Sequence, residues 1–432
     1  MSGISRVDKY IVEMMGLQSM KEAEPLRSVP INIVLGADRT GKTGIMGLAA
    51  MGLAIRCFKG PIRIHLPGGD VASLPCQKSS IEDFIKEEAA RADAANRIEF
   101  LSGNPDNYPT ISVGCEIKGA YVADCAGWRA FIGGAAPGDL AALPVAAPAA
   151  VFAIACVFSK LFAAHVLGNQ KYGREHWQFS LLSFNYEDAN DYQVETQKID
   201  LGEISLLGAG AIGSGFAFTL WMSEFEADLL ILDRDRYEEP NFETSMLISK
   251  TDELKMALKA ECLASHLAIR KGIIIEPVRE NVNKESPSLH KKRDVLVCGV
   301  DNSETRRELD GANVEVILNG GIGGGKKDAG HILFSRHARE DLFLSQLYPE
   351  IVNETTADSQ VAPAEFKENC SRIPYLDATM AAPFLGLATG ALLVAGCAQR
   401  AMAVKSDGNY LKMDMLKLQK NYRKENKRRN LA

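Results

Sequence analysis

The sequence lacks the marks of several classes of protein. It contains no C-x-x-C pair, and its nine cysteines are scattered, so neither a disulfide framework nor a cysteine zinc site is indicated. An odd number of scattered thiols is typical of a protein kept in a reducing compartment. The N-terminus also lacks the charged-then-apolar pattern of a signal peptide. We therefore expect a cytoplasmic location.

A surplus of positive charge is missing too. The formal net charge is −6, so the chain as a whole offers no attraction to nucleic acid or to an anionic membrane surface. The most apolar stretch, residues 140–167, is rich in Ala but is interrupted by prolines, Lys160 and His165. A membrane span needs about 20 apolar residues, and we interpret this stretch as a buried helix. We expect neither a nucleic-acid partner nor a membrane.

Strand-like and helical segments alternate along the 432 residues, which indicates α/β domains with open, mostly parallel sheets. A chain of this length is expected to form more than one core. The pattern of strand, glycine turn and helix starts twice, at residues 31 and 204. We therefore predict two tandem Rossmann-like halves that form a pseudo-dimer within one chain. The predicted boundaries are residues 1–175 for the first half and 176–415 for the second, joined near 168–200, with a basic tail at 416–432.

The individual elements are predicted from hydrophobic periodicity and turn residues. Strands are expected at residues 31–35, 62–66, 97–101, 110–113, 204–207, 229–232, 273–277, 295–298 and 331–335. Helices are expected at residues 7–17, 44–55, 216–223, 255–270 and 381–402.

The glycine turn of the second half is Gly208-Ala-Gly210-Ala-Ile-Gly213, between a strand and a helix. Glycines permit a tight turn and let backbone N–H groups approach a phosphate at the helix N-terminus. Asp233 follows Gly213 by twenty residues, at the end of the next strand, where a carboxylate can accept hydrogen bonds from ribose hydroxyls. These features alone indicate a dinucleotide site.

The segments that follow contain residues that hydride transfer does not need. They are Asp233-Arg-Asp235-Arg-Tyr-Glu-Glu-Pro-Asn241, a helix that begins near Lys259, and Val300-Asp301-Asn302-Ser-Glu-Thr-Arg306 directly after a strand. In this order the segments resemble the ThiF/MoeB and ubiquitin-activating enzyme family over residues 200–310. The resemblance implies an adenylation site in place of an NAD site.

The resemblance also implies a role for each of these residues. Acyl adenylation requires ATP and Mg²⁺, and charge on the triphosphate must be neutralised. Lys259 would reach the phosphates as a catalytic residue, and Asp301 would hold the Mg²⁺. The implied ATP-binding residues are Gly208, Gly210, Gly213, Asp233, Asp235, Asn241, Lys259 and Arg306. A purely structural interpretation stays open, in which Lys259 is a surface lysine, Asp301 a helix N-cap and Arg306 a solvated charge.

One position departs from the family. Thr244 stands where the family has Arg, which puts one phosphate contact in doubt. In the family an Arg from the partner half also reaches the site, from a segment that Arg6-Val-Asp-Lys9-Tyr resembles. We expect Lys9 in this role, with Arg6 as the second choice. A basic residue at the start of a helix is common, so an incidental role stays open.

The first half contains Gly36-Ala-Asp-Arg-Thr-Gly41-Lys42-Thr43, which matches the P-loop pattern. Taken literally, Lys42 would bind phosphates and Thr43 would bind Mg²⁺. Asp124 is the best candidate for the carboxylate that would bind Mg²⁺ together with Thr43 in such a site. We favour a degenerate glycine turn in an inactive half, because the strands at 62–66 and 97–101 run into Pro67 and Ser102 and neither ends in a convincing metal-binding carboxylate. The second strand is also not followed by an acidic residue, which argues against NAD binding in this half. A P-loop NTPase is the alternative.

Cys370 lies in Phe366-Lys-Glu-Asn-Cys370-Ser-Arg-Ile-Pro374, within a crossover loop expected at about residues 326–377. The context resembles that of the thioester cysteine of ubiquitin-activating enzymes. Nearby Lys367 and Arg372 would lower the pKa of an exposed thiol and so favour a nucleophile. An incidental loop cysteine is the alternative.

The compact two-half chain resembles the activating enzymes of bacterial ubiquitin-like (Bil-type) conjugation operons, including those of antiphage defence. This implies adenylation of the C-terminus of a ubiquitin-like protein, thioester formation on Cys370 and transfer to a conjugating enzyme. The alternatives are a ThiF-type adenylyltransferase that acts on a sulfur carrier, peptide or tRNA-linked carboxylate without a thioester, and a P-loop NTPase that uses residues 36–43.

Overall fold

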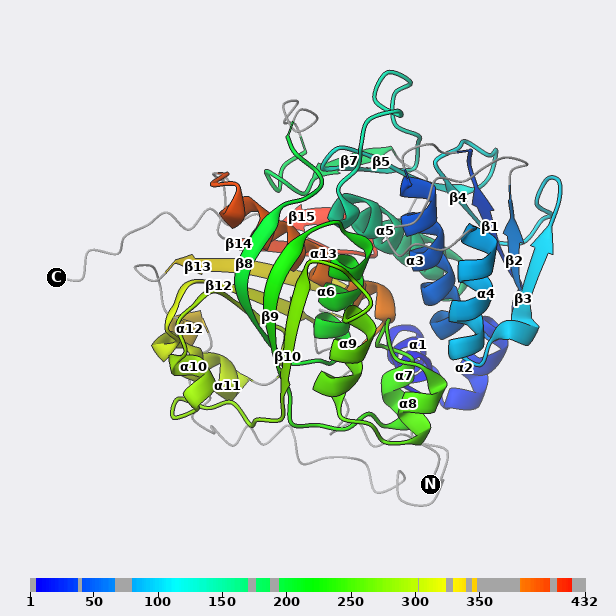
Figure 1. The fold of residues 1–432 in the computed structure, drawn as a ribbon. Helices are drawn as coiled ribbons and strands as arrows, with labels where there is room; N and C mark the ends of the chain where they lie inside the picture. The colour runs from blue at the N-terminus through cyan, green and yellow to red at the C-terminus, as the bar shows by residue number, and fades with distance from the viewer. Residues whose placement is uncertain are drawn as a thin grey trace, which may run out of the picture.

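The computed structural model describes residues 5–37, 41–66, 80–169, 176–186, 194–301, 303–323, 329–338, 344–347, 381–404 and 410–421. Two sheets are flanked and separated by helices (Figure 1). The first sheet has seven strands in the order β3-β2-β1-β4-β5-β6-β7, and the second has eight in the order β10-β9-β8-β11-β12-β13-β14-β15. The two orders correspond strand for strand from β1 and β8 onward, so the predicted repeat of two Rossmann-like halves is confirmed.

The strands of the first sheet are β1 (Ile31–Leu35), β2 (Ile62–His65), β3 (Ile98–Leu101), β4 (Thr110–Val113), β5 (Tyr121–Ala126), β6 (Arg129–Ile132) and β7 (Trp177–Ser180). Those of the second are β8 (Asp200–Leu207), β9 (Glu226–Leu232), β10 (Ile273–Val278), β11 (Arg293–Cys298), β12 (Val314–Ile322), β13 (His331–Ala338), β14 (Tyr410–Asp414) and β15 (Gln419–Asn421). In each sheet the first five strands in spatial order are parallel and the others antiparallel. Strands buried on both faces read as continuous apolar runs, as the fully buried β1 does.

The helices of the first half are α1 (Arg6–Met15), α2 (Met20–Arg27), α3 (Lys42–Cys57), α4 (Ile81–Arg91) and α5 (Ala147–His165). Those of the second half are α6 (Ala211–Met222), α7 (Glu239–Phe242), α8 (Lys250–Leu254), α9 (Lys259–Leu267), α10 (Pro287–His290), α11 (Ser303–Glu308), α12 (Leu344–Leu347) and α13 (Pro383–Ala401). Short 3₁₀ turns lie at Ala95–Arg97 and Leu309–Gly311.

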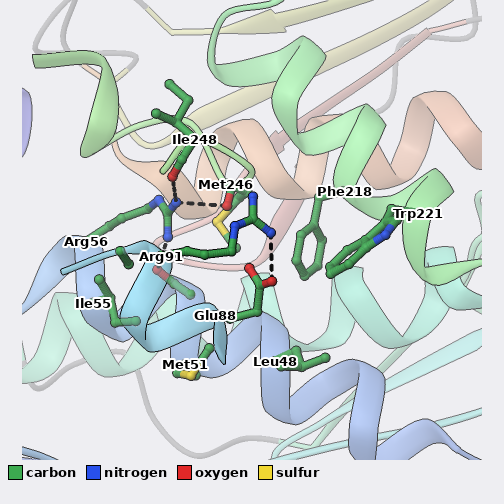
Figure 2. A pocket seen from close by; sticks show the side chains of 12 residues that line it. Leu48, Met51, Ile55, Arg56, Glu88, Arg91, Phe218, Trp221, Met246 and Ile248 are labelled. Carbon is green, nitrogen blue, oxygen red and sulfur yellow. Dashed lines mark hydrogen bonds and ion pairs between the residues drawn. The ribbon is translucent and has the colours of Figure 1, made fainter. Parts of the chain in front are cut away.

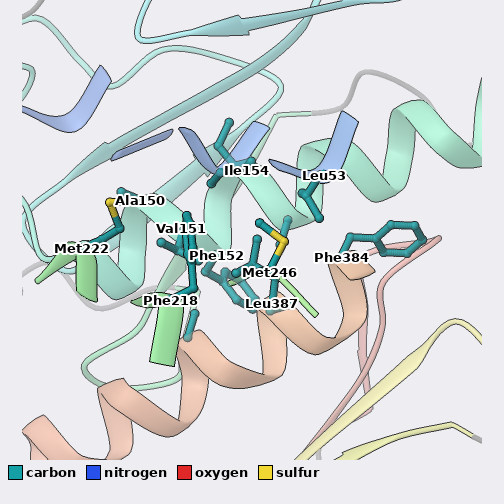
Figure 3. Close-up of a cluster of buried hydrophobic side chains, with 14 of the residues drawn as sticks. Leu53, Ala150, Val151, Phe152, Ile154, Phe218, Met222, Met246, Phe384 and Leu387 are labelled. Carbon is teal, nitrogen blue, oxygen red and sulfur yellow. The ribbon is translucent and has the colours of Figure 1, made fainter. Parts of the chain in front are cut away.

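The two halves share one hydrophobic core. Side chains from α3, α5, α6 and α13 meet in it, among them Leu53, Ile154, Phe218 and Leu387 (Figure 3). Helices α6 and α13 cross with backbones almost in contact, because a Cβ on Gly390 would lie 2.2 Å from the backbone of α6. Helices α5 and α13 are long and apolar enough to span a membrane by composition, and 100% and 89% of their apolar windows are buried. The buried helix that we predicted within residues 140–167 is present as Ala147–His165.

Three predicted boundaries need correction. Strand β7 pairs with β6 in the first sheet, so the first half continues past residue 175 to at least Ser180. Strand β15 pairs with β14, and Leu416 and Leu418 are buried, so the second sheet continues past residue 416, where a tail was predicted. The alternating apolar and polar residues from Tyr410 onward are the signal of a half-buried strand. The helix predicted at 255–270 is interrupted, because α8 ends at Leu254 and α9 begins at Lys259.

Candidate active site

The candidate site lies at the carboxyl ends of three neighbouring strands of the second sheet. Strand β8 lies between β9 and β11, and all three are parallel. The chain enters Gly208 after β8, Asp233 after β9 and Asp301 after β11. Strand order reverses between β8 and β11, which is where ligands bind in open α/β sheets. Three residues that are far apart in the sequence therefore meet at one edge.

Each of the three positions in the turn is occupied by glycine for a different structural reason. Gly208 has a φ of +90°, which a residue with a side chain rarely adopts. A Cβ on Gly213 would lie 1.9 Å from the carbonyl oxygen of Gly208, so the helix packs directly on the turn. A Cβ on Gly210 would meet no described heavy atom within 4 Å. Gly210 therefore borders open space at the start of α6, where a phosphate can approach backbone N–H groups.

Asp233 connects this turn to the end of β9. Its two carboxylate oxygens accept hydrogen bonds from the backbone N–H groups of Ala209, at 2.6 Å, and of Asp235, at 2.7 Å. Burial raises the pKa of Asp233 above its ordinary value, while these N–H groups and the charge of Lys259 oppose the rise. The hydroxyl of Tyr237 also donates to the carbonyl of Ala209, at 3.2 Å. The carboxylate thus lies beside the glycine turn, where a ribose would be expected.

Lys259 and Asn241 are placed close to the same turn. The Lys259 ammonium lies 3.4 Å from a carboxylate oxygen of Asp235, and its backbone N–H donates to the Asp235 carbonyl. The side-chain oxygen of Asn241 accepts from the backbone N–H of Glu238 at 2.9 Å and caps the short helix α7. Lys259 thus has a carboxylate partner that a phosphate could replace, while Asn241 also holds the loop in shape.

Asp301 and Arg306 have different environments. Asp301 is exposed at the end of β11. The guanidinium of Arg306 is buried and donates to the side-chain oxygen of Asn319 at 2.7 Å, to the Gly320 carbonyl at 2.9 Å and to the Val300 carbonyl. We therefore correct the predicted ATP contact of Arg306. Helix α11 turns its side chain back toward the sheet, where it holds the end of β11 that carries Asp301.

The N-terminal helix approaches this site from the first half. Burial lowers the pKa of Arg6, while Asp301, Glu238 and Glu243 act in the opposite direction by their negative charge. Lys9, our first choice on the sequence, is only 2% exposed. Arg6, our second choice, lies within the electrostatic reach of Asp301, and a role for Lys9 stays a prediction.

In the first half, the lysine that follows the glycine turn forms a buried ion pair within the protein. The ammonium of Lys42 lies 2.8 Å from a carboxylate oxygen of Asp124, and both residues are buried. Lys42 also donates to the carbonyl of Ala141 at 3.2 Å, and Asp124 accepts from the backbone N–H groups of Cys125 and Ala136. The lysine that would bind phosphate is thus neutralised inside the protein, as suits a degenerate turn.

A pocket is lined by residues of both halves (Figure 2). Arg56 of α3 is buried there and donates to the carbonyls of Ser245, at 2.9 Å, Met246, at 2.8 Å, and Ile248, at 3.3 Å. Arg91 pairs with Glu88 in the same pocket at 2.7 Å. These carbonyls belong to the segment that follows Asn241. Arg56 of the first half therefore holds the segment that follows Asn241, a contact that sequence reasoning missed.

Cys370 and Asn302 lie outside the described residues. Of the cysteines that the structure describes, Cys115 is partly exposed and the others are buried. Burial raises the pKa of the Cys156 and Cys298 thiols, and that of Cys397 to about 12. These three thiols behave as small apolar groups, as their apolar neighbours in the sequence predicted.

Comparison with known proteins covers both halves. Residues 29–181 match the BilD N-terminal domain, and residues 202–403 match the BilD C-terminal domain. A bacterial E1-like protein BilD from Collimonas sp. is 27% identical over 360 residues, which are 78% of this chain and 74% of that protein. The NEDD8-activating enzyme E1 catalytic subunit of Schizosaccharomyces pombe is 24% identical over 138 residues, or 31% of this chain and 30% of that protein.

Solved structures with a similar arrangement align over about half of the chain. E. coli MccB with AMPCPP and its peptide MccA aligns with a TM-score of 0.39 and 15% identity, over 51% of this chain and 62% of that one. E. coli tRNA N6-threonylcarbamoyladenosine dehydratase, TcdA, aligns with a TM-score of 0.33 and 15% identity, over 46% of this chain and 86% of that one.

Proposed function

We propose that this chain activates a ubiquitin-like protein with ATP. The chain belongs to the BilD family, within the ThiF/MoeB and ubiquitin-activating enzyme superfamily. A carboxylate oxygen of the substrate's C-terminus attacks the α-phosphorus of ATP. The bond from that phosphorus to the bridging oxygen breaks, and pyrophosphate leaves with its electron pair. The product is an acyl-adenylate.

The observation that carries this proposal is the meeting of Gly208, Asp233 and Asp301 at one sheet edge, with Lys259 beside them. The open space at Gly210 lets the triphosphate reach the backbone N–H groups at the start of α6. Asp233 would accept hydrogen bonds from the ribose. Lys259 would exchange the carboxylate of Asp235 for a phosphate and stabilise the charge that develops as pyrophosphate leaves.

The described residues also fit Mg²⁺ bound together with a nucleotide. They contain no group of three or more His, Cys, Asp or Glu side chains that could hold a metal ion. Mg²⁺ in nucleotide sites needs only one or two carboxylates, because phosphates and water supply the other ligands. Asp301 is the carboxylate in the right place, and Mg²⁺ there would neutralise triphosphate charge.

Arg6 would supply the positive charge that Thr244 does not. Thr244 is buried and its hydroxyl donates to the Asn241 carbonyl at 3.3 Å, so it serves the backbone of the loop. Arg6 approaches Asp301 from the other half of the chain. We propose that Arg6 neutralises the negative charge that develops on the triphosphate in the transition state.

The second step of the proposal is a thioester on Cys370. The Cys370 sulfur attacks the carbonyl carbon of the acyl-adenylate, AMP leaves with the mixed-anhydride oxygen, and the thiol proton is lost. A conjugating enzyme then takes the acyl group onto its own cysteine. The sequence around Cys370 and the similarity to E1-like proteins support this step. A cytoplasmic location and a role in antiphage defence remain predictions, which cell fractionation and plaque counts on an operon with or without the gene would test.

The test is exchange of labelled pyrophosphate into ATP, driven by a ubiquitin-like protein. Lys259→Ala and Asp301→Ala should each lower the exchange rate by at least about 100-fold. The matched control is Lys42→Met with Asp124→Asn, which removes both charges of the buried pair and leaves neither unpaired. Loss of ATP turnover in that double variant, with turnover intact in Lys259→Ala and Asp301→Ala, would support a P-loop NTPase and contradict the proposal.

A further inference from the structure

A carboxylate of the second half caps the first helix of the other half. One oxygen of Glu243 accepts hydrogen bonds from the Ser5 hydroxyl, at 2.7 Å, and from the Val7 backbone N–H, at 3.1 Å. The other oxygen accepts from the guanidinium of Arg27 at 3.0 Å. The side chain of Glu243 is mostly buried, with 18% exposed. These contacts cross the boundary between the two halves.

The contacts complete the N-terminus of α1. Ser5 is the N-cap and accepts from the backbone N–H of Asp8 at 3.0 Å, while Glu243 satisfies the N–H of Val7. The first N–H groups of a helix have no partner within it, and a negative charge near them is favourable. Glu243 therefore stabilises the first turn of α1 both by a hydrogen bond and by its charge.

Arg27 fixes this arrangement to the body of the first half. Its guanidinium pairs with Asp8 at 2.7 Å and donates to the carbonyls of Arg56, at 2.6 Å, and Cys57, at 2.8 Å. Glu243 thus binds a cation that is already held by the end of α3. Both the backbone and the side chains of the first turn of α1 have a defined place relative to the second half.

Arg6 lies between the two residues that Glu243 binds. Ser5 and Val7 are both hydrogen-bonded to the same carboxylate oxygen, so the backbone of Arg6 cannot shift without breaking at least one of these bonds. The charges that face Arg6 are those of Asp301, Glu238 and Glu243, all in the second half. The backbone position of Arg6, which lies within the electrostatic reach of these carboxylates, is therefore set through Glu243.

We propose that Glu243 is a positioning residue for adenylation, which holds α1 across the boundary between the halves so that Arg6 points at the triphosphate. The inference rests on the proposed function. Glu243 itself touches no reacting atom. It occupies the position next to Thr244, where the family's Arg is missing, and it brings in the cation that replaces that Arg.

The test is a double-mutant cycle on ATP–pyrophosphate exchange with Glu243→Ala and Arg6→Ala. Glu243→Ala should lower kcat about 10- to 100-fold with KM for ATP changed less than about threefold, because an interaction made in the transition state is lost. In the Arg6→Ala background the same change should cost less than about twofold. Glu243→Gln keeps an acceptor oxygen and should lose less than Glu243→Ala. Glu224→Ala removes an exposed carboxylate of the second half and should match the wild type.

The double-mutant cycle can overturn the inference in three ways. An unchanged kcat in Glu243→Ala, an increase in KM alone, or an equal loss in the Arg6→Ala background would each contradict it. Hydrogen exchange of α1 provides a readout that does not need activity: Glu243→Gln should keep more protection of residues 6–15 than Glu243→Ala, and equal protection in both variants and the wild type would refute the cap. If the wild-type protein shows no pyrophosphate exchange, the proposed function fails, and the hydrogen exchange result still decides whether Glu243 holds α1.

Discussion

Alanine at each glycine of the turn should separate folding from ATP binding. At Gly210 the added methyl group has open space around it within the described residues, and φ is −76°. We expect Gly210→Ala to change the free energy of unfolding by less than about 1 kcal/mol. The other two substitutions meet the protein's own backbone, so their effects on folding should be larger.

The size of those effects follows from the geometry. At Gly213 a Cβ would lie 1.9 Å from the Gly208 carbonyl oxygen, so α6 must move away from the turn. Overpacking of this kind costs about 1–3 kcal/mol or more. At Gly208 the φ of +90° adds about 1–2 kcal/mol of backbone strain, and the Cβ would lie 3.2 Å from the backbone of Gly299. Gly213→Ala should be the least stable of the three variants.

Gly210→Ala, which should affect folding least, should lower the affinity for ATP. The methyl group of Gly210→Ala occupies the space that phosphate oxygens need to approach the start of α6. A lost hydrogen bond to a charged group costs about 1.5–3 kcal/mol, so the affinity for ATP should fall about 10- to 100-fold. Urea unfolding and isothermal titration with ATP measure the two quantities on the same samples. A Gly210→Ala protein that binds ATP as the wild type does would refute the assignment of the phosphate site.

Four further predictions concern other parts of the chain. Arg56→Met removes the donor to three carbonyls across the halves and should destabilise the protein by about 3 kcal/mol in urea unfolding; Arg63→Met, at an exposed ion pair of β2, should cost less than about 1 kcal/mol. Because burial raises the pKa of Asp233, lowering the pH should weaken ATP binding already above the ordinary titration range of Asp. Protonation of Asp233 should stabilise the folded state relative to the unfolded state as the pH falls through the raised pKa. Asp233→Asn should remove this pH dependence from titrations with ATP. The double variant Lys42→Met with Asp124→Asn should stay within about twofold of wild-type pyrophosphate exchange, and a loss greater than tenfold would contradict the inactive first half. Cys370→Ala should retain pyrophosphate exchange but form no thiol-sensitive adduct on a gel, whereas an unchanged adduct would exclude Cys370 as the nucleophile.

The elements that could be predicted from the sequence are those whose structure depends on neighbouring residues in the chain. The glycine turn, the strand that precedes it and the acid at the end of the next strand are set by short-range rules on glycine, β-branched residues and parallel strand ends. Gly208 and Asp233 followed from these rules, whereas Asp301 was predicted from the resemblance to the family. The burial of α5 followed from its small apolar residues, and α13 was predicted as a helix.

The contacts between the halves could not be predicted in the same way. Arg27 and Glu243 are 216 positions apart, and no periodicity in either segment indicates the other. Arg306 was misjudged because its spacing from Asp301 was clear while the direction of its side chain was not. It points back to Asn319, and only the packed sheet shows this. Asp124 was predicted as the best candidate for the metal-binding carboxylate of a P-loop site, but its direct pairing with Lys42 depends on strand β5 lying close to the start of α3.

We expect this chain to have one ATP site, which lies in the second half. Isothermal titration with Mg²⁺ and ATP measures both the number of sites and, through variants, their place. We predict one ATP bound per chain, lost in Asp233→Ala and retained in Lys42→Met with Asp124→Asn. Two bound nucleotides per chain, or binding that is lost only when the Lys42 pair is changed, would contradict the account.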